Sequence, residues 1–174
     1  MSEEPTTGGD GGSGGPGRRR PAANRRRAAR IGAVQALYQI DVTGAPVADV
    51  VAEFQAHRLA NLLEPLDSDE PPPDVDRAWF ARLVRGAAAS ARELDPMIAA
   101  NLAESWSLER IGYALRACLR AGAYELASCP DVPVRVVINE YIEVARAFFD
   151  GDEPGFVNAV LDRLAMRLRP EERG

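Results

Sequence analysis

The feature that most constrains the fold is the spacing of the apolar residues, which repeats every three or four positions along most of the chain. Ile31, Val34 and Leu37 show this spacing in the first such stretch. Residues spaced in this way lie on one face of an α-helix, because each residue turns the helix by about 100°. Apolar and polar residues do not alternate over any stretch long enough for a sheet. The sequence therefore predicts an all-α fold in which helices pack on helices.

Prolines and acidic clusters divide the periodic pattern into about seven expected helices. These helices begin near Asn24, Val47, Trp79, Asp95, Leu108, Pro133 and Pro154. The three prolines of "LDSDEPPPDVD" (residues 66–76) separate the second helix from the third. Pro154 suits the first position of the last helix, because the N–H that proline lacks would have no partner there. With 46% hydrophobic residues, the 174-residue chain is able to bury one core or two small ones.

The first 21 residues differ in composition from the rest of the chain. They contain the stretch "TTGGDGGSGGPGRRRP", which has too few apolar residues to compensate for the entropy lost on ordering. We expect this glycine- and arginine-rich leader to be disordered.

Positive charge is concentrated near the start of the chain, although the net charge of the whole chain is −5. Residues 1–30 hold seven arginines against three acids, whereas residues 31–174 hold fourteen arginines against twenty-three acids. Arg25, Arg26, Arg27 and Arg30 fall in the opening turns of the first expected helix, where the partial positive charge of the N-terminus disfavours cations. Since Arg27 and Arg30 continue the apolar sector, we expect the helix to protrude beyond the core and to leave the arginines in water. This arrangement predicts a polyanionic ligand.

The sequence gives little support for a metal site. Cys118 and Cys129 stand eleven positions apart without a CxxC spacing, and His57 is the single histidine, so a structural zinc site has too few ligands. We expect both cysteines to be reduced residues in or near the core. His57 acting as a base for a cysteine is a weaker interpretation than His57 at a helix boundary.

Motifs for catalysis are absent as well. The sequence contains no glycine-rich phosphate loop, no zinc-protease motif and no calcium-binding loop. Asp67, Asp69 and Glu70 lie among prolines and are interpreted as solvated loop residues. No apolar run is long enough to span a membrane, and no signal-peptide core is present. We therefore expect a cytoplasmic binding protein that is not an enzyme and uses neither a cofactor nor a metal.

Four segments, in the same order along the chain, resemble the NusB family of bacterial transcription antitermination factors. They are "RRRAARIGAVQALYQID", "LRAGAYEL", "DVPVRVVINEYIEVA" and "GDEPGFVNAVLDRLA", and the resemblance extends over about residues 22–169. It implies a seven-helix fold in two small bundles, here residues 22–94 and residues 95–170, with a tail over 171–174. It also implies binding to the boxA element of nascent ribosomal RNA together with NusE, a protein of the small ribosomal subunit, in the transcription elongation complex.

The resemblance also implies which residues contact RNA. The arginines at the start of the first helix, here Arg26, Arg27 and Arg30, bind phosphates, and two aromatic residues, here Tyr38 and Phe156, lie against bases. Single-stranded RNA is commonly held by cations along its backbone and by aromatic rings against its bases. Core packing is the alternative for both rings, because each lies on an apolar strip.

Two further residues of the implied RNA site have open alternatives. Gln35 either hydrogen-bonds a base edge or faces water. Asp152 corresponds to an acid beside the RNA in the family, but it is also well placed to cap the last helix. At two positions the chain departs from many relatives, with Ala28 in place of an arginine and Gly155 in place of a lysine. Either two phosphate contacts of the family are missing and binding is weaker, or Arg25 or the leader residues Arg18, Arg19 and Arg20 replace them.

The acidic body of the chain predicts a basic protein partner. The resemblance makes this partner NusE, although Leu115 stands where some relatives have an acid that helps to hold NusE. Candidate docking acids are Glu109 and Glu125 on the fifth expected helix and Glu140 and Glu143 on the sixth, with solvated surface charge as the alternative for each.

Other assemblies and functions compete with this interpretation. Some relatives form a homodimer over the RNA surface, and a homodimer of this chain is a further expectation to test. One alternative function is the regulatory module of a ribosomal-RNA methyltransferase, but the glycine-rich cofactor loop of such an enzyme is absent. The other is a helical scaffold that binds only proteins, which leaves the arginine cluster unexplained.

Overall fold

The computed structural model describes residues 22–62 and 74–173. Within these ranges it contains eight α-helices and no strand, which confirms the predicted all-α fold. The helices are α1 (Ala22–Thr43), α2 (Val47–Glu53), α3 (Arg77–Ala89), α4 (Ala91–Ala100), α5 (Tyr113–Ser128), α6 (Val134–Phe148), α7 (Glu153–Leu168) and α8 (Pro170–Arg173). The expected disordered leader, most of the proline-rich break and its acids Asp67, Asp69 and Glu70 lie outside the described residues.

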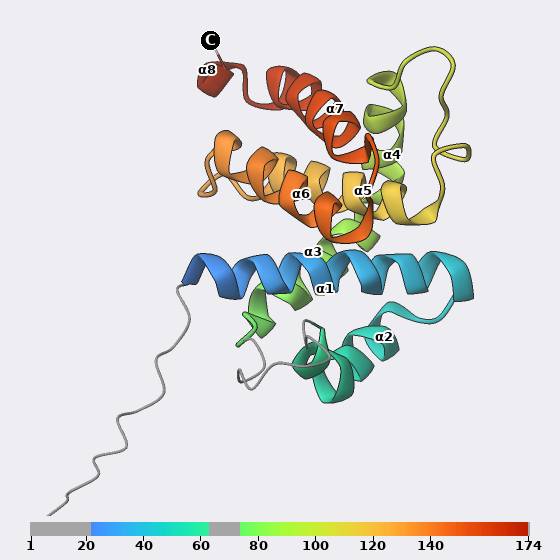
Figure 1. The fold of residues 1–174 in the computed structure, drawn as a ribbon, viewed down its shortest axis with the longest axis vertical. Helices are drawn as coiled ribbons and strands as arrows, with labels where there is room; N and C mark the ends of the chain where they lie inside the picture. The colour runs from blue at the N-terminus through green and yellow to red at the C-terminus, as the bar shows by residue number, and fades with distance from the viewer. Residues whose placement is uncertain (1–21, 63–73, 174) are drawn as a thin grey trace, which may run out of the picture.

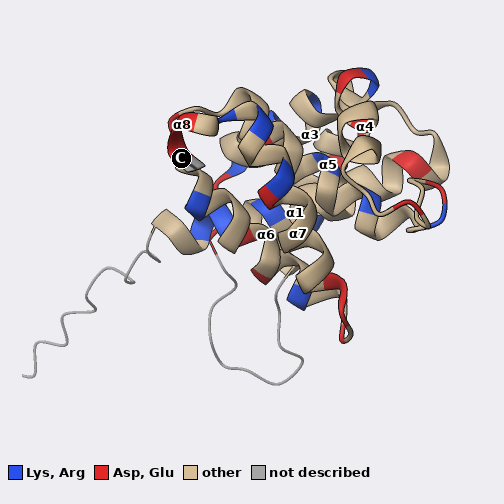
Figure 2. Cartoon of the chain, turned by 90° about the horizontal axis from the view of Figure 1, so that it is seen from above, with Lys and Arg blue, Asp and Glu red and all other residues tan. Residues whose placement is uncertain are grey.

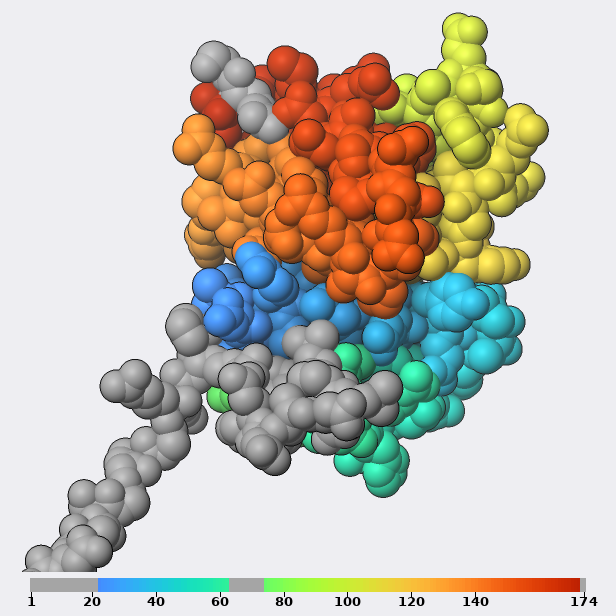
Figure 3. Space-filling model, viewed as in Figure 1, coloured from blue at the N-terminus to red at the C-terminus, as the bar shows by residue number. Residues whose placement is uncertain are grey.

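Helix α1 lies at the centre of the molecule and contacts helices on both of its sides. Figure 1 shows α2 on one side of it, α5, α6 and α7 on the other and α3 crossing behind it, and it packs directly on α2, α3, α5 and α6. In the space-filling view, α1 forms a band across the molecule directly below α6 and α7 (Figure 3). A single amphipathic strip was predicted for α1, but α1 is buried nearly all round from Ala28 to Leu37.

Small residues let the neighbouring helices approach α1 closely. Ala29, Ala33 and Ala36 are fully buried. A Cβ atom added at Gly32 would lie only 2.8 Å from Cδ1 of Leu62, so this glycine leaves room for a leucine side chain. The core on either side of α1 consists of larger residues, and burying each leucine or phenylalanine side chain contributes about 1.5–3 kcal/mol.

The helix after α3 begins earlier than the sequence predicts. We expected it to begin at Asp95, because Pro96 suits a first helical position, but α4 begins at Ala91 and contains Pro96. Ser90 ends α3 and also precedes α4, so the two helices follow one another almost directly. The expected subdomain boundary between residues 94 and 95 therefore falls within α4, and the division into two subdomains remains a prediction.

The fifth expected helix begins later than predicted. Gly112 has a φ of +85°, a left-handed conformation that interrupts the helix expected from Leu108, so α5 begins at Tyr113. Glu109 therefore lies in the turn before α5. At the other end of the chain, the expected tail contains most of the short helix α8. None of the described helices is both long enough and apolar enough to cross a membrane.

The end of α7 is fastened to the end of α5 by one arginine. The buried guanidinium of Arg169 donates hydrogen bonds of 2.6 to 2.8 Å to four backbone carbonyls, those of Glu125, Leu126, Cys129 and Val132. The last carbonyls of a helix lack partners within the helix and carry partial negative charge. A cation at this position therefore donates hydrogen bonds to them and compensates that charge. Cys118 and Cys129 are buried free thiols, as predicted.

Candidate nucleic-acid interface

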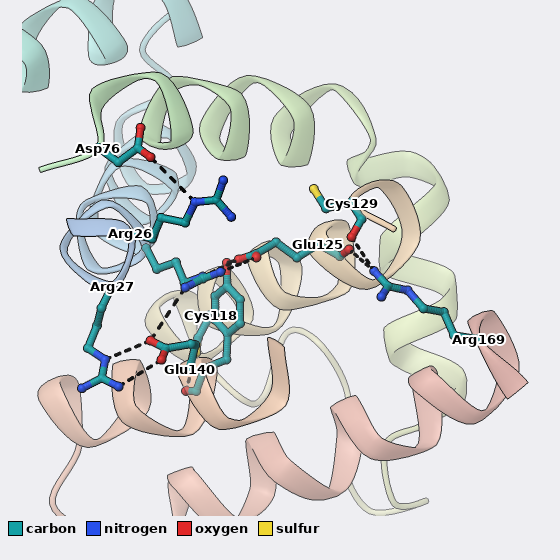
Figure 4. A network of polar contacts seen from close by, with 10 residues as sticks. Arg26, Arg27, Asp76, Cys118, Glu125, Cys129, Glu140 and Arg169 are labelled. Atoms are coloured by element: carbon teal, nitrogen blue, oxygen red, sulfur yellow. Dashed lines mark hydrogen bonds and ion pairs between the residues drawn. The ribbon is translucent and has the colours of Figure 1, made fainter. Parts of the chain in front are cut away.

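The arginines at the start of α1 face carboxylates of the chain itself. Figure 4 shows that Arg26 points toward α3 whereas Arg27 points toward α6, so the cluster divides between the two sides of α1. Basic and acidic residues lie side by side in this part of the molecule (Figure 2). The unfavourable charge at the helix N-terminus is thus compensated within the protein, before any ligand is bound.

On the α3 side, the ion pairs are long and partly exposed. Nη1 of Arg25 lies 3.9 Å from Oδ2 of Asp74, and Nε of Arg26 lies 3.7 Å from Oδ2 of Asp76. The Arg26 guanidinium also lies 4.2 Å from the centre of the Trp79 ring. Exposed pairs of this kind contribute about 0–1 kcal/mol, so Arg25 and Arg26 are able to bind a phosphate at little cost.

On the α6 side, Arg27 is held more closely. Its Nε and Nη2 donate to the two carboxylate oxygens of Glu140 at 2.9 and 3.0 Å, while 42% of its side chain remains exposed. The hydrogen bonds that Arg27 donates to Glu140 raise the pKa of Arg27, which is therefore charged at any physiological pH. A phosphate at Arg27 must share the guanidinium with Glu140 or displace that carboxylate.

Arg30 is buried, so the prediction that it lies in water is wrong. Its Nε and Nη2 each donate to Glu125 at 2.8 Å, and the hydroxyl of Tyr141 donates to the same carboxylate at 2.5 Å. Burial disfavours the charged form of Arg30, but the hydrogen bonds and the charge of Glu125 outweigh this effect and raise its pKa. Helix α1 does not protrude here, because α5 and α6 pack over this turn.

The four candidate docking acids differ in accessibility. Glu125 is fully buried against Arg30, so it does not face a partner, contrary to its expected place on the surface of the fifth helix. Glu140 is mostly buried between Arg27 and Arg30. Glu143 is partly exposed and pairs with Arg146 at 2.5 Å, and Glu109 is exposed. Glu109 and Glu143 are thus the candidates that a protein partner is able to reach.

Tyr38 lies on the surface and not in the core, although its position on an apolar strip made core packing an alternative. Its exposed fraction is 44%, and its ring meets the equally exposed ring of Tyr113 edge to face, with 6.5 Å between centroids. Tyr38 and Gln35 line a groove of about 440 Å³ together with Val34, Gln39, Val42, Thr43, Arg58, Ala114 and Phe148. The groove therefore combines an aromatic ring with amide groups able to contact a base.

Phe156 is partly buried and lines a second groove, of about 610 Å³. Its ring contacts the half-exposed ring of Trp106, with 6.2 Å between centroids. The other residues of this groove are Arg110, Ile111, Leu115, Phe149, Gly151, Asp152 and Glu153. Sequence reasoning missed Trp106 and Arg110: both lie in the connection before α5, and Arg110 fell within the helix that was expected from Leu108.

Asp152 occupies the N-cap position of α7 without capping the helix through its side chain. Its backbone carbonyl accepts from the N–H of Phe156 at 3.1 Å, but its carboxylate makes no capping hydrogen bond. The prediction that Asp152 is a cap is therefore correct for its position and wrong for its side chain. The exposed carboxylate faces the groove of Phe156 instead.

Arg27 and Tyr38 lie on the same side of α1. They are eleven residues apart, which is close to three helical turns and about 16 Å along the axis. Both are near α6, through Glu140 for Arg27 and through Phe148 for the groove of Tyr38. The surface thus offers an exposed cation and an exposed aromatic ring along one line, as single-stranded RNA requires.

Fold and surface together define an all-helical binding protein whose candidate ligand is single-stranded RNA. The sequence pattern that defines the NusB family matches residues 27–166. The chain is 49% identical over 151 residues to "Transcription antitermination protein NusB" of Rhizobium johnstonii, covering 87% of this chain and 92% of that protein. It is 47% identical over 148 residues to the protein of the same name from Bartonella tribocorum, covering 85% and 92%. The chain belongs to the NusB family.

Solved structures share the fold. NusB of T. maritima matches with a TM-score of 0.66 at 27% identity, covering 90% of this chain and 99% of that one. A chain from a structure titled as antitermination factors NusB and NusE in complex with dsRNA also matches with a TM-score of 0.66. Its identity is 23%, covering 81% of this chain and 96% of that one, so this second match concerns the fold alone.

Proposed function

We propose that this protein is a cytoplasmic transcription antitermination factor that binds the boxA element of nascent ribosomal RNA together with NusE and promotes processive transcription without catalysing a reaction. The observation that carries the proposal is the alignment of partly exposed Arg27 with exposed Tyr38 along one side of α1. The name of the relatives and the fold shared with a NusB chain from a NusE and RNA complex support it.

In this proposal the arginines of α1 divide their tasks. Arg25, Arg26 and Arg27 bind phosphates, because their side chains are partly exposed and their pairs with acids are replaceable. Arg30 instead acts from within the core, where it holds Glu125 and lies 3.7 Å from Glu140. Tyr38 and Phe156 contact bases, with Gln35 and Asp152 beside them in the two grooves.

NusE binds to the acidic body in this proposal. Residues 31–174 carry nine more acids than arginines, which repels RNA and favours a basic protein. A basic partner docked on Glu109 and Glu143 neutralises part of this charge and extends the cationic surface available to RNA. NusE therefore raises the affinity for RNA in this proposal.

Titration of boxA RNA with and without saturating NusE tests the proposed function. We expect NusE to raise the RNA affinity by the equivalent of about 1–3 kcal/mol, and RNA to raise the NusE affinity by the same factor, because linkage is reciprocal. Equal RNA affinity in both titrations contradicts the joint mechanism. A protein-only scaffold predicts no RNA binding in either titration.

A further inference from the structure

Helix α3 and the first two residues of α4, before the exposed acid Glu93, form a second basic segment within the acidic body of the chain. Residues 77–92 hold four arginines and no acid, whereas the rest of the chain after residue 30 holds ten arginines against twenty-three acids. All four arginines are exposed: Arg77, Arg82, Arg85 and Arg92. A surface helix usually carries residues of both charges, so a segment with positive charge only is unusual in a chain whose other residues are mainly acidic.

The exposed face of α3 is a narrow stripe of two arginines between two alanines. Ala78, Arg82, Arg85 and Ala89 follow one another at steps of four, three and four, the spacing of one helical face, and all are exposed. The opposite face, which carries Phe80, packs on α1, and beside the stripe a Cβ atom added at Gly86 would overlap the ring of Tyr124 of α5. Because alanine side chains are small, a polyanion backbone is able to approach the two guanidiniums closely. We call Ala78, Arg82, Arg85 and Ala89, together with the exposed Arg92 three residues further on in α4, the α3 stripe.

The α3 stripe is continuous with the arginines of α1. The guanidiniums of Arg26 and Arg82 lie 4.2 and 5.2 Å from the centre of the same Trp79 ring. Trp79 therefore holds one cation from the candidate RNA interface and one from the stripe against the same aromatic side chain. Arg82 also donates to the backbone carbonyl of Ser128 and is hydrogen-bonded to the side chain of Tyr124, which leaves the rest of its five N–H groups available.

We propose that the α3 stripe binds the backbone of the RNA that flanks the boxA element, which extends the RNA track from Arg26 through Arg82 and Arg85 to Arg92. This inference rests on the proposed function. A nascent transcript continues beyond the element, and an acidic body repels the continuing strand everywhere except at a basic segment. Guanidinium groups bind phosphates without reading the base, so the contact is independent of sequence.

Two RNAs distinguish the flanking contact from boxA binding itself, both titrated in the presence of saturating NusE. One holds only the boxA element, and the other adds unstructured flanks on both sides. We expect the wild-type protein to bind the longer RNA more tightly, and Arg85→Gln/Arg92→Gln, which keeps Arg82, to lose most of this difference while binding the short RNA normally. For the longer RNA, the slope of log affinity against log salt should become shallower by about 1.4, since each phosphate contact of a single strand contributes about 0.7.

Two control variants accompany this experiment. Arg85→Lys/Arg92→Lys keeps both charges and should retain most of the difference between the RNAs. Arg167→Gln removes an exposed arginine of α7, remote from the stripe in sequence, and should bind both RNAs like the wild type. Because Arg85 and Arg92 are exposed, the melting temperatures of all variants should match that of the wild type.

The possible outcomes separate the inference from the function on which it rests. Failure of the wild type to bind either RNA overturns the proposed function and the inference with it. Equal binding of the two RNAs by the wild type, or an undiminished difference in the glutamine variant, overturns the inference alone. If the glutamine variant weakens NusE binding and leaves both RNA affinities unchanged, the stripe is a protein surface and the inference is wrong.

Discussion

At the scale of single residues, Glu140 is the acid with which an RNA phosphate competes most directly. Its carboxylate accepts two hydrogen bonds from Arg27, at 2.9 and 3.0 Å, and lies 3.7 Å from Arg30. If Arg27 turns to a phosphate, Arg30 still compensates the charge of Glu140. The free protein therefore keeps Arg27 in place with a contact that RNA is able to replace.

Removal of this competing charge should strengthen RNA binding. We expect Glu140→Gln to raise the RNA affinity about two- to fivefold, because a partly exposed ion pair contributes up to about 1 kcal/mol. Filter-binding titrations at low salt measure the change. Glu143→Gln is the comparison variant, since its carboxylate pairs with Arg146 and acts on Arg27 only through its charge, without a hydrogen bond. A lower affinity of Glu140→Gln than of the control would show that Glu140 positions Arg27 and does not compete for it.

The exposed ring of Tyr38 permits a test of base contact that folding does not obscure. Tyr38→Ala should weaken RNA binding by about 1–3 kcal/mol, the range for loss of a stacked aromatic ring, with little change in melting temperature. Tyr38→Phe keeps the ring and should bind nearly as the wild type does. Comparable loss in both variants would assign the effect to the hydroxyl group and contradict stacking.

Helical spacing predicted the helix and the helix face on which these residues lie, but not which residues surround them. Arg30 and Tyr38 continue the same apolar strip, yet the structure buries the arginine and exposes the tyrosine. The partner of Arg30 is Glu125, which is 95 residues away in the sequence, so no local pattern indicates the pair. Tyr38 is exposed because it lies beside the beginning of α5, where its ring meets the ring of Tyr113. The residue at which α5 begins depends in turn on the conformation of Gly112.

At the scale of elements, the joint between α5 and α7 depends on Arg169. We expect Arg169→Met to lower the free energy of unfolding by about 3–5 kcal/mol, because four buried carbonyls lose their charged donor. Denaturant unfolding followed by circular dichroism measures this loss. Arg167→Met, an exposed position two residues earlier, should change the stability by less than about 0.5 kcal/mol. Similar stability of the two variants would mean that water replaces the guanidinium at these carbonyls.

The ends of the elements were the part of the fold least accessible to prediction. All seven expected helices are present, because their apolar periodicity is a property of each segment alone. The beginnings of α4 and α5 were misplaced by four and five residues, since they depend on whether Pro96 starts or continues a helix and on the left-handed conformation of Gly112. Packing against other helices determines both of these helix beginnings.

At the scale of the whole molecule, the distribution of charge determines how RNA binding depends on salt. The sequence places Arg25, Arg26, Arg27 and Arg30 together at the start of α1, which corresponds to four phosphate contacts if each of them meets the RNA. The structure leaves three, because only 3% of the Arg30 side chain is exposed and its guanidinium is bound to Glu125. A titration over a range of salt concentrations is able to distinguish three contacts from four.

With a short boxA RNA, we expect log affinity to fall against log salt with a slope of about −2, since three single-strand contacts contribute about 0.7 each. Arg26→Gln/Arg27→Gln should reduce this slope to about −0.7 and weaken binding at low salt far more than at high salt. Arg30→Met should instead destabilise the fold by about 3–5 kcal/mol, because it leaves the carboxylate of Glu125 buried and uncompensated. A slope near −3 for the wild type would mean that Arg30 leaves Glu125 to meet a phosphate, and that RNA binding rearranges the buried contacts between α1, α5 and α6.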